Sequence, residues 1–366
     1  MRGIVFTGER AELTDDLEVR PPGPNEVAVR IRAAGVCHSD VSVIDGTIPW
    51  PAPAVLGHEG AGVVEEVGSE VSRVKVGDHV VVTTLANCGM CRWCSSGLPT
   101  WCRSSMGNMD QPFRLGGEPA YNFAAASVFT ERTVVREVQA VPISKEVPFE
   151  SACLIGCGVV TGVGAVLNRA KVARGDTAAV FGVGGVGLNV IQALAICDAT
   201  TIVAVDTVAA KEPLARRFGA THFVDATQAG VPNAIRQCLP PGEDGVFNAR
   251  GVDWAFDCVG HPSAVRDGVE SLAWGGSCVI LGVPPPGTEL AVPFSLMTHV
   301  DRGVMGCRYG SVRPHRDVPL IVQLYLADRL LLDELVSETQ PLEGFEKVVS
   351  DMHEGRLARG VLTLDG

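Results

Sequence analysis

Aromatic residues and positive charge are both scarce in this chain of 366 residues. Phe, Trp and Tyr together make up 5% of it, and 42 acidic residues outnumber 30 Lys and Arg, which gives a formal net charge of −12. Surfaces that bind nucleic acid carry an excess of positive charge. The charge balance therefore argues against a nucleic-acid partner.

Long apolar runs and a secretory leader are missing as well. No uninterrupted run of 18 apolar residues occurs, so we expect no membrane span. The first six residues resemble a strand, not the apolar block and cleavage site of a signal peptide, and we expect a cytoplasmic protein. Twelve cysteines in such a chain predict metal binding instead of a disulfide framework.

Four of the cysteines are close together in the sequence. Cys88, Cys91, Cys94 and Cys102 have the spacing C-x2-C-x2-C-x7-C. Four thiolates in one short loop bind a single tetrahedral ion, and zinc is the usual ion for four sulfur ligands. In the common iron–sulfur run the fourth cysteine follows after three residues and precedes a proline, which is not the case here. Because four protein ligands leave no open coordination position, this zinc site is predicted to be structural.

The length of the chain and its changing pattern predict two domains. Up to about residue 150, short strands and turns predominate, as in the alternating segment 26–32 and the glycine-bounded segment 60–68, and this region could form a barrel. From Thr161 onward, strands alternate with helices, which predicts a parallel sheet built from βαβ units. The expected strands are 177–182, 201–205, 222–224, 254–258 and 277–282, and the expected helices are 186–195 and 211–218. A helix at 318–328 and a closing strand at 360–364 follow.

A glycine run lies between the first of these strands and its helix. Gly182-Val183-Gly184-Gly185-Val186-Gly187 matches G-x-G-x-x-G in the context that a dinucleotide fingerprint requires. Its glycines let the backbone approach a pyrophosphate at a helix N-terminus. Asp206 ends the next strand, where a carboxylate binds the adenosine ribose and repels a 2′-phosphate. Lys211 could reach the same ribose. The run predicts a site that prefers NAD to NADP.

Three further metal-ligand residues are scattered along the chain. Cys37, His58 and Cys157 would form a zinc site with one open position, which catalysis requires, but spacing alone does not join them. A lone histidine is more often structural than a metal ligand. Asp40 could orient His58 from behind.

These motifs occur in one order and with separations that resemble those of the zinc-dependent alcohol dehydrogenases of the medium-chain dehydrogenase/reductase superfamily. The segments on which the resemblance is based are Cys37-His38-Ser39-Asp40, Gly57-His58-Glu59, the four-cysteine loop, Cys157 and the glycine run. The resemblance spans essentially the whole chain. It implies an α/β protein in which a mostly-β GroES-like catalytic domain (1–158 and 305–366) is combined with a doubly wound Rossmann domain (159–304) that binds NAD.

The resemblance also assigns roles to individual residues. Cys37, His58 and Cys157 match the catalytic zinc ligands, and Glu59 matches a nearby carboxylate that can swing toward the metal. Ser39 matches the hydroxyl that binds the substrate oxygen and passes its proton on. The four-cysteine loop matches the structural zinc site, so two zinc ions per chain are expected. The positions matching cofactor contacts are His38 and Arg359 at the pyrophosphate, and Thr161 with its packing neighbour Val186 at the nicotinamide.

The substrate is expected to be a primary or secondary alcohol, or the matching aldehyde or ketone. Positions that match the substrate pocket are Ile48, Thr84, Met106, Phe123, Ala124 and Val283. Thr84 and Ala124 are small, which favours an aromatic or medium-chain substrate. The alternative is a thiol-dependent formaldehyde dehydrogenase of the same fold. Relatives of that type carry an acidic residue and an arginine at the positions of Ile48 and Met106, which argues against it.

Three further expectations concern catalysis, the proton relay and assembly. A binding protein with this fold but without catalysis is an open alternative, although the retention of all three ligands weighs against it. Ser42 stands where many relatives place the histidine that ends the proton relay. The resemblance implies a homodimer, in which the segment 290–305 would lie at a sheet edge.

Overall fold

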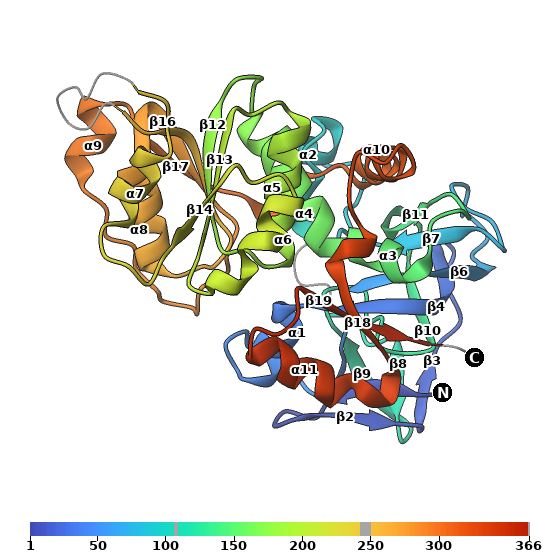
Figure 1. Cartoon of the computed structure of the whole chain (residues 1–366). Helices are drawn as coiled ribbons and strands as arrows, with labels where there is room; N and C mark the ends of the chain where they lie inside the picture. The colour runs from blue at the N-terminus through green and yellow to red at the C-terminus, as the bar shows by residue number, and fades with distance from the viewer. Residues whose placement is uncertain (106–108, 242–249, 365–366) are drawn as a thin grey trace. The chain divides into compact units, whose positions relative to one another are not determined.

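The computed structural model describes residues 1–105, 109–241 and 250–364. The chain forms two compact units (Figure 1). Unit 1 contains Met1–Val160 and the chain from Val312 onward, and unit 2 contains Thr161–Ser311. The functional domain boundaries predicted above, at 158/159 and 304/305, stay predictions.

Unit 1 is built mainly from two sheets. One has the strand order β2-β1-β5-β9-β8-β3, and the other has the order β11-β7-β6-β4-β19-β18, with β10 also paired to β4. The strands are β1 (Gly3–Phe6), β2 (Ala11–Thr14), β3 (Leu17–Val19), β4 (Glu26–Val36), β5 (Ala54–Val55), β6 (Glu59–Val67), β7 (His79–Val82), β8 (Phe113–Leu115), β9 (Glu118–Asn122), β10 (Arg132–Arg136), β11 (Ala140–Pro142), β18 (Val336–Pro341) and β19 (Arg359–Thr363). Its helices are α1 (His38–Ile44), α2 (Arg92–Ser95), α3 (Phe149–Leu154), α10 (Pro314–Leu326) and α11 (Phe345–His353).

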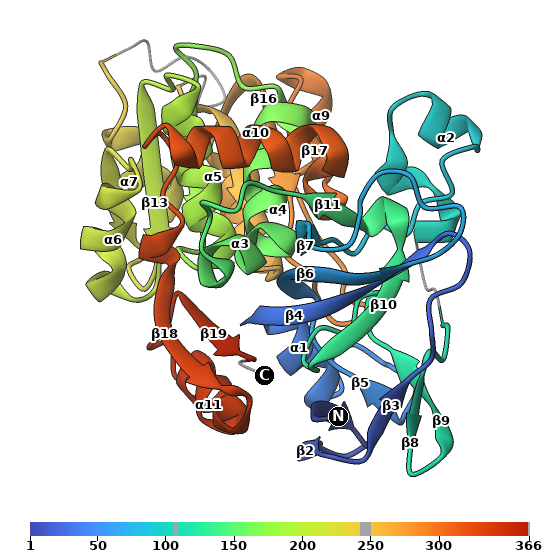
Figure 2. The ribbon, with the colours of Figure 1, turned by 90° about the vertical axis from the view of Figure 1, so that its right-hand side faces the viewer.

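Strand β4 is more deeply buried than its sequence predicts. Alternation at 26–32 predicted a half-buried strand; Val27, Val29 and Ile31 are buried and Arg30 is exposed, as expected, but Ala28 on the other face is fully buried as well. The strand lies beside β6, β10 and β19 (Figure 2), and α3 packs against it. Apolar side chains from β4 join those of β6, β7 and α11 in the main core of the unit. The prediction was wrong in part because the covering elements come from distant parts of the sequence.

Unit 2 contains one parallel sheet with the strand order β14-β13-β12-β15-β16-β17. Its strands are β12 (Thr177–Phe181), β13 (Thr201–Asp206), β14 (His222–Asp225), β15 (Val252–Asp257), β16 (Leu272–Ile280) and β17 (Gly303–Gly306). The helices are α5 (Gly185–Ile196), α6 (Glu212–Arg217), α7 (Val231–Gln237), α8 (Pro262–Ser271) and α9 (Phe294–His299). Counted within the unit, the order is 3-2-1-4-5-6, which is that of dinucleotide-binding sheets. The predicted Rossmann architecture is confirmed.

A long apolar helix runs from Phe149 to Ala170. It comprises α3, α4 (Val160–Gly164) and two wider π-helical turns at Ile155–Val159 and Ala165–Ala170. By length and composition alone it could cross a membrane, although it contains no uninterrupted run of 18 apolar residues. Because 83% of its most apolar 18-residue window is buried inside the structure, it has the character of a core helix.

Candidate metal centres and cofactor-binding loop

The three scattered ligand residues come together in unit 1. The ligand atoms of Cys37, His58, Glu59 and Cys157 all lie within 4.8 Å of one another. Cys37 lies between β4 and α1, and His58 directly precedes β6. Cys157 lies in the π-helical turn at Ile155–Val159, a kind of local widening that is frequent at functional sites. Two thiols, an imidazole and a carboxylate within this distance fit a zinc ion.

Asp40 holds two of these ligands in place. Its Oδ1 lies 3.2 Å from His58 Nδ1 and accepts a hydrogen bond from the Gly57 N–H, while its Oδ2 accepts one from the Cys37 N–H. The contact predicted between Asp40 and His58 is therefore present. With Nδ1 facing a carboxylate, Nε2 is the nitrogen left to bind a metal. The first turn of α1 thus connects the two ligand loops.

Burial and mutual contact shift the ionisation of the four residues. The hydrogen bond with Cys157 holds the pKa of Cys37 well below its usual range, whereas the same bond and burial raise the pKa of Cys157. Burial opposes the charged form of His58, but the charges of Asp40 and Cys37 outweigh it and raise its pKa. A cation held at the same place would favour the thiolate form of both cysteines.

Glu59 is the carboxylate in this group of four residues. Its Oε1 accepts a hydrogen bond from the Gly158 N–H at 3.0 Å and lies 3.5 Å from Arg359 Nη2. Among the described residues, Oε2 has no hydrogen-bond partner, and burial raises the Glu59 pKa to about 7. A buried carboxylate oxygen without a partner is costly unless something else binds it, which supports the fit to a metal. Arg359 is buried beside Glu59, and its pyrophosphate role stays a prediction.

Ser39 and His38 lie on the first turn of α1. Ser39 Oγ is 4.0 Å from Cys37 Sγ, so its hydroxyl can face an oxygen held at the ligand set. His38 is exposed on the same turn. The contacts that the resemblance implies, with the substrate for Ser39 and with the cofactor for His38, stay predictions.

An aromatic cluster borders the same ligand set. The Phe123 ring meets the His58 ring edge to face with centroids 5.4 Å apart, and the Trp50 ring meets Phe123 at 5.0 Å. Trp50 Nε1 donates a hydrogen bond to the Asn122 carbonyl oxygen. Phe123 was expected near the substrate from the resemblance. Trp50 was missed, because no local pattern connects it with His58.

The remaining pocket positions are spread over both units. Ile48, Thr84 and Ala124 belong to unit 1, and Ile48 and Ala124 pack against its main core. Val283 belongs to unit 2 and is largely exposed. Met106 lies outside the described residues.

The four-cysteine loop forms the second donor set. The Sγ atoms of Cys88, Cys91, Cys94 and Cys102 lie within 4.8 Å of one another, as the spacing predicted. The backbone N–H groups of Cys91 and Cys88 donate to the Cys88 and Cys102 sulfurs, each at 3.4 Å. Burial raises the pKa of Cys94 to about 12. At Cys102 the hydrogen bond from the Cys88 N–H and other donors outweigh burial and lower the pKa to about 6. Four sulfurs in this arrangement fit a tetrahedral zinc ion.

The glycine run has the geometry of a dinucleotide loop. Gly182 follows β12 with φ +90°, and a Cβ at Gly187 would lie 1.8 Å from the Gly182 carbonyl oxygen. Gly184 caps α5, and apart from Gly184 and its two chain neighbours no described residue has an atom within 4 Å of where its Cβ would be. The first and third glycines thus allow a tight turn and close helix–strand packing, and the second leaves the space that a pyrophosphate needs. Gly185 and Val186 begin the helix.

Asp206 lies where the fingerprint requires it. It ends β13, and its Oδ2 accepts a hydrogen bond from the Val183 N–H at 2.7 Å. Lys211 Nζ is 3.0 Å from the same oxygen. The carboxylate is therefore fixed beside the glycine run. Thr161 begins unit 2, one helical turn after Cys157 in sequence, and its nicotinamide contact stays a prediction.

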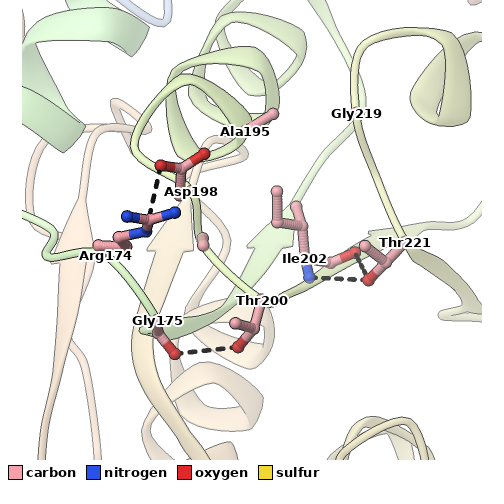
Figure 3. A pocket seen from close by; sticks show the side chains of 9 residues that line it. Arg174, Gly175, Ala195, Asp198, Thr200, Ile202, Gly219 and Thr221 are labelled. Carbon is pink, nitrogen blue, oxygen red and sulfur yellow. Dashed lines mark hydrogen bonds and ion pairs between the residues drawn. The ribbon is translucent and has the colours of Figure 1, made fainter.

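A separate hollow of about 460 Å³ lies in unit 2 (Figure 3). It is lined at the amino ends of β12 and β13, whereas the glycine run follows the carboxyl end of β12. Arg174 and Asp198 form an ion pair there at 3.4 Å, but both side chains are mostly exposed. The hollow contains neither donor set and is not part of the site.

Comparison with known proteins agrees with this geometry. Residues 23–145 match the family described as alcohol dehydrogenase GroES-like domain, and residues 185–327 match zinc-binding dehydrogenase. An S-(hydroxymethyl)glutathione dehydrogenase of Komagataella pastoris is 37% identical over 96% of this chain and 93% of its own length. One from Paracoccus denitrificans is also 37% identical, over 94% and 95%.

Solved structures are similar over almost the whole chain. A Burkholderia ambifaria alcohol dehydrogenase zinc-binding domain protein has a TM-score of 0.92 at 35% identity, and benzyl alcohol dehydrogenase from Acinetobacter calcoaceticus has 0.91 at 30%. Both matches cover 100% of this chain and 99% of the other chain. This chain belongs to the zinc-dependent alcohol dehydrogenases of the medium-chain dehydrogenase/reductase superfamily.

Proposed function

We propose that this enzyme interconverts an aromatic or medium-chain alcohol and its aldehyde or ketone, with NAD as the hydride carrier. The observation that carries the proposal is the aromatic cluster of Trp50 and Phe123 directly against the ligand His58. Such a cluster favours an apolar substrate, because burying an aromatic ring beside others releases water from both. One similar solved structure is named benzyl alcohol dehydrogenase.

The residues of unit 1 would prepare the alcohol for oxidation. Cys37, His58 and Cys157 would hold a zinc ion, which would supply Lewis acidity to the alcohol oxygen. Asp40 keeps the His58 ring in one orientation, and Glu59 is the carboxylate that can approach the ligand set. Ser39 Oγ lies within reach of that set, so it would accept the hydroxyl proton and pass its own proton on toward the cofactor ribose. The catalytic residues would therefore be Ser39 and the three ligands.

The residues of unit 2 would bind NAD. The glycine run would hold the pyrophosphate, and Asp206 with Lys211 would bind the adenosine ribose. His38, Thr161, Val186 and Arg359 are the other proposed cofactor contacts. Under this proposal catalysis belongs to residues 1–158 and 305–366, and cofactor binding to 159–304. We also propose a cytoplasmic homodimer.

A thiol-dependent formaldehyde dehydrogenase is the second candidate. It is supported by the names of several curated relatives, which are 37–39% identical to this chain. Against it, Ile48 occupies the position at which the resemblance expects an acidic residue to anchor the thiol adduct. An apolar side chain cannot replace a carboxylate in binding a charged or polar group.

A substrate panel tests the two candidates. Benzyl alcohol, octanol, ethanol and formaldehyde would be assayed with NAD and NADP, with and without glutathione. We expect kcat/KM to be highest for the first two alcohols with NAD, and to be independent of glutathione. Formaldehyde oxidation that requires glutathione and exceeds the alcohol rates would instead establish the second candidate.

A further inference from the structure

The turn that carries Phe123 has an unusual backbone. Ala124, Ala125 and Ser127 have φ values of +51°, +57° and +49°, although none of them is glycine. A residue with a Cβ is strained in this left-handed region, so the turn persists only if its surroundings hold it. The segment 123–127, here called the Phe123 turn, is therefore under strain at the point where it presents Phe123 to His58.

Hydrogen bonds from three directions hold the Phe123 turn. Ser127 Oγ accepts from the Phe123 N–H and donates to the Val55 carbonyl oxygen, both at 2.8 Å. Thr133 Oγ1 donates to the Ala126 carbonyl oxygen at 2.6 Å. The third bond comes from Gln139, whose Nε2 donates to the Ala125 carbonyl oxygen at 2.8 Å.

Of these three side chains, Gln139 alone is also seen here to bind Thr83, the residue directly after strand β7. Its Nε2 donates to the Thr83 carbonyl oxygen at 2.9 Å, and its backbone oxygen accepts from the Thr83 N–H. Its Oε1 accepts from the Arg136 N–H, so every polar atom of this amide has a partner. The side chain is 1% exposed. One buried amide thus joins the residue before Thr84 to the residue after Ala124.

We infer that Gln139 is a positioning residue for substrate specificity, which holds the Phe123 turn and the Thr83–Thr84 strand end in fixed places relative to the metal ligand His58. The inference rests on the proposed function, because it takes Phe123 as a wall against the substrate. The side chain of Gln139 hydrogen-bonds to the backbone of Ala125, Thr83 and Arg136, and it acts on the Phe123 turn and on Thr83 through these bonds. Burial makes each of its bonds costly to lose, since an orphaned carbonyl at Ala125 or Thr83 would seek another partner.

The test is the ratio of kcat/KM for benzyl alcohol to that for ethanol in Gln139→Met. The substitution keeps the length of the side chain and removes its donors. We expect the ratio to fall about tenfold, the lower end of what an apolar pocket can discriminate. A residue with a purely structural role would lower stability or the active fraction, and both substrates would then lose activity equally. Thr130→Val is the matched control, because its buried hydroxyl donates to the Arg2 carbonyl oxygen, not to the Phe123 turn.

Two further variants complete the experiment. Ala125→Gly in the Gln139→Met background should restore part of the ratio, because glycine adopts the left-handed conformation without strain. If Gln139→Met does not fold, Thr133→Val removes one bond to the same turn and should lower the ratio too. A wild-type enzyme that prefers neither benzyl alcohol nor octanol to ethanol would overturn the proposed function, and this inference with it. A wild-type preference that Gln139→Met or Thr133→Val leaves unchanged would overturn the inference alone.

Discussion

Ser39 and Ser42 lie three positions apart on α1, and residues with this spacing share one face of a helix. Ser39 is close to the ligand set, whereas Ser42 cannot titrate near neutral pH. We expect Ser39→Ala to lower the rate of hydride transfer by about 10²–10⁴-fold, the usual contribution of a positioned proton-transfer group. Ser42→His should add a group with a pKa of about 6.5 to the pH–rate profile. Stopped-flow formation of NADH measures both, and a near-wild-type rate in Ser39→Ala would show that the proton leaves by another route.

Asp206 is the residue on which the expected preference for NAD over NADP depends. Its carboxylate is fixed by the Val183 N–H and by Lys211, so it cannot easily move away from a 2′-phosphate. Like charges at close range repel, and Asp206→Gly should therefore reduce the preference for NAD over NADP by about tenfold or more. The ratio of kcat/KM for the two cofactors measures this. Equal efficiency of the wild-type enzyme with both would refute the role of Asp206.

Individual site residues differ in how far the sequence could predict them. The four cysteines of the loop and the glycine run were predictable because their chemistry depends on local spacing. Cys37, His58 and Cys157 meet only through the fold, so their assignment needed the resemblance. Trp50 and Gln139 were not predicted, because their roles arise from contacts with Phe123 and the turn after it, which are distant in the sequence.

At the scale of the elements, the four-cysteine loop is expected to bind one zinc ion, and the π-helical turn at Ile155–Val159 supplies a ligand for the other. Loss of a ligand should have a different effect at each site. Cys157→Ala should abolish turnover while the protein stays folded, since it removes a ligand at the open site. Cys94→Ala should chiefly lower Tm, by about 5–10 °C, because structural zinc contributes directly to the free energy of folding.

Elemental analysis, thermal unfolding and activity of the two variants test this difference. Wild-type protein should contain two zinc ions per chain, and each variant should contain one. Fully active wild-type protein with a single zinc would contradict the assignment of two sites.

Elements were predicted well where local patterns dominate, and less well where tertiary contacts set their ends. The strand β13 and the helix α5 agree closely with the expected 201–205 and 186–195. Strand β16 begins at Leu272, five residues before the expected start, because Leu272 pairs with Val252 of β15; the register is then irregular, and pairing resumes at Ser277, the expected start. Helix α10 begins at Pro314, before the expected 318, since proline is well suited to the first helical turn.

At the scale of the whole molecule, the edge of the parallel sheet in unit 2 is where two copies of the chain could pair. The segment 290–305 was expected to lie at a sheet edge. Of this segment, only Gly303–Met305 enters a strand, β17, while Phe294–His299 forms α9. Strand β17 is the edge strand next to β16, so one side of its backbone has no partner strand among the described residues. A short exposed edge of this kind can pair with the same edge of a second copy across a twofold axis.

Charge placed on this edge should prevent such pairing. Val304 is 37% exposed on β17, and Val304→Glu would bring two like charges close to the axis of a dimer. We expect light scattering at micromolar concentration to give the mass of two chains for wild type and a shift toward one chain for this variant. Val76→Glu is the control, because Val76 is also an exposed valine, at 59%, but belongs to unit 1 outside any strand. A wild-type monomer or tetramer, or a Val304→Glu variant that remains fully dimeric, would show that β17 does not join two copies.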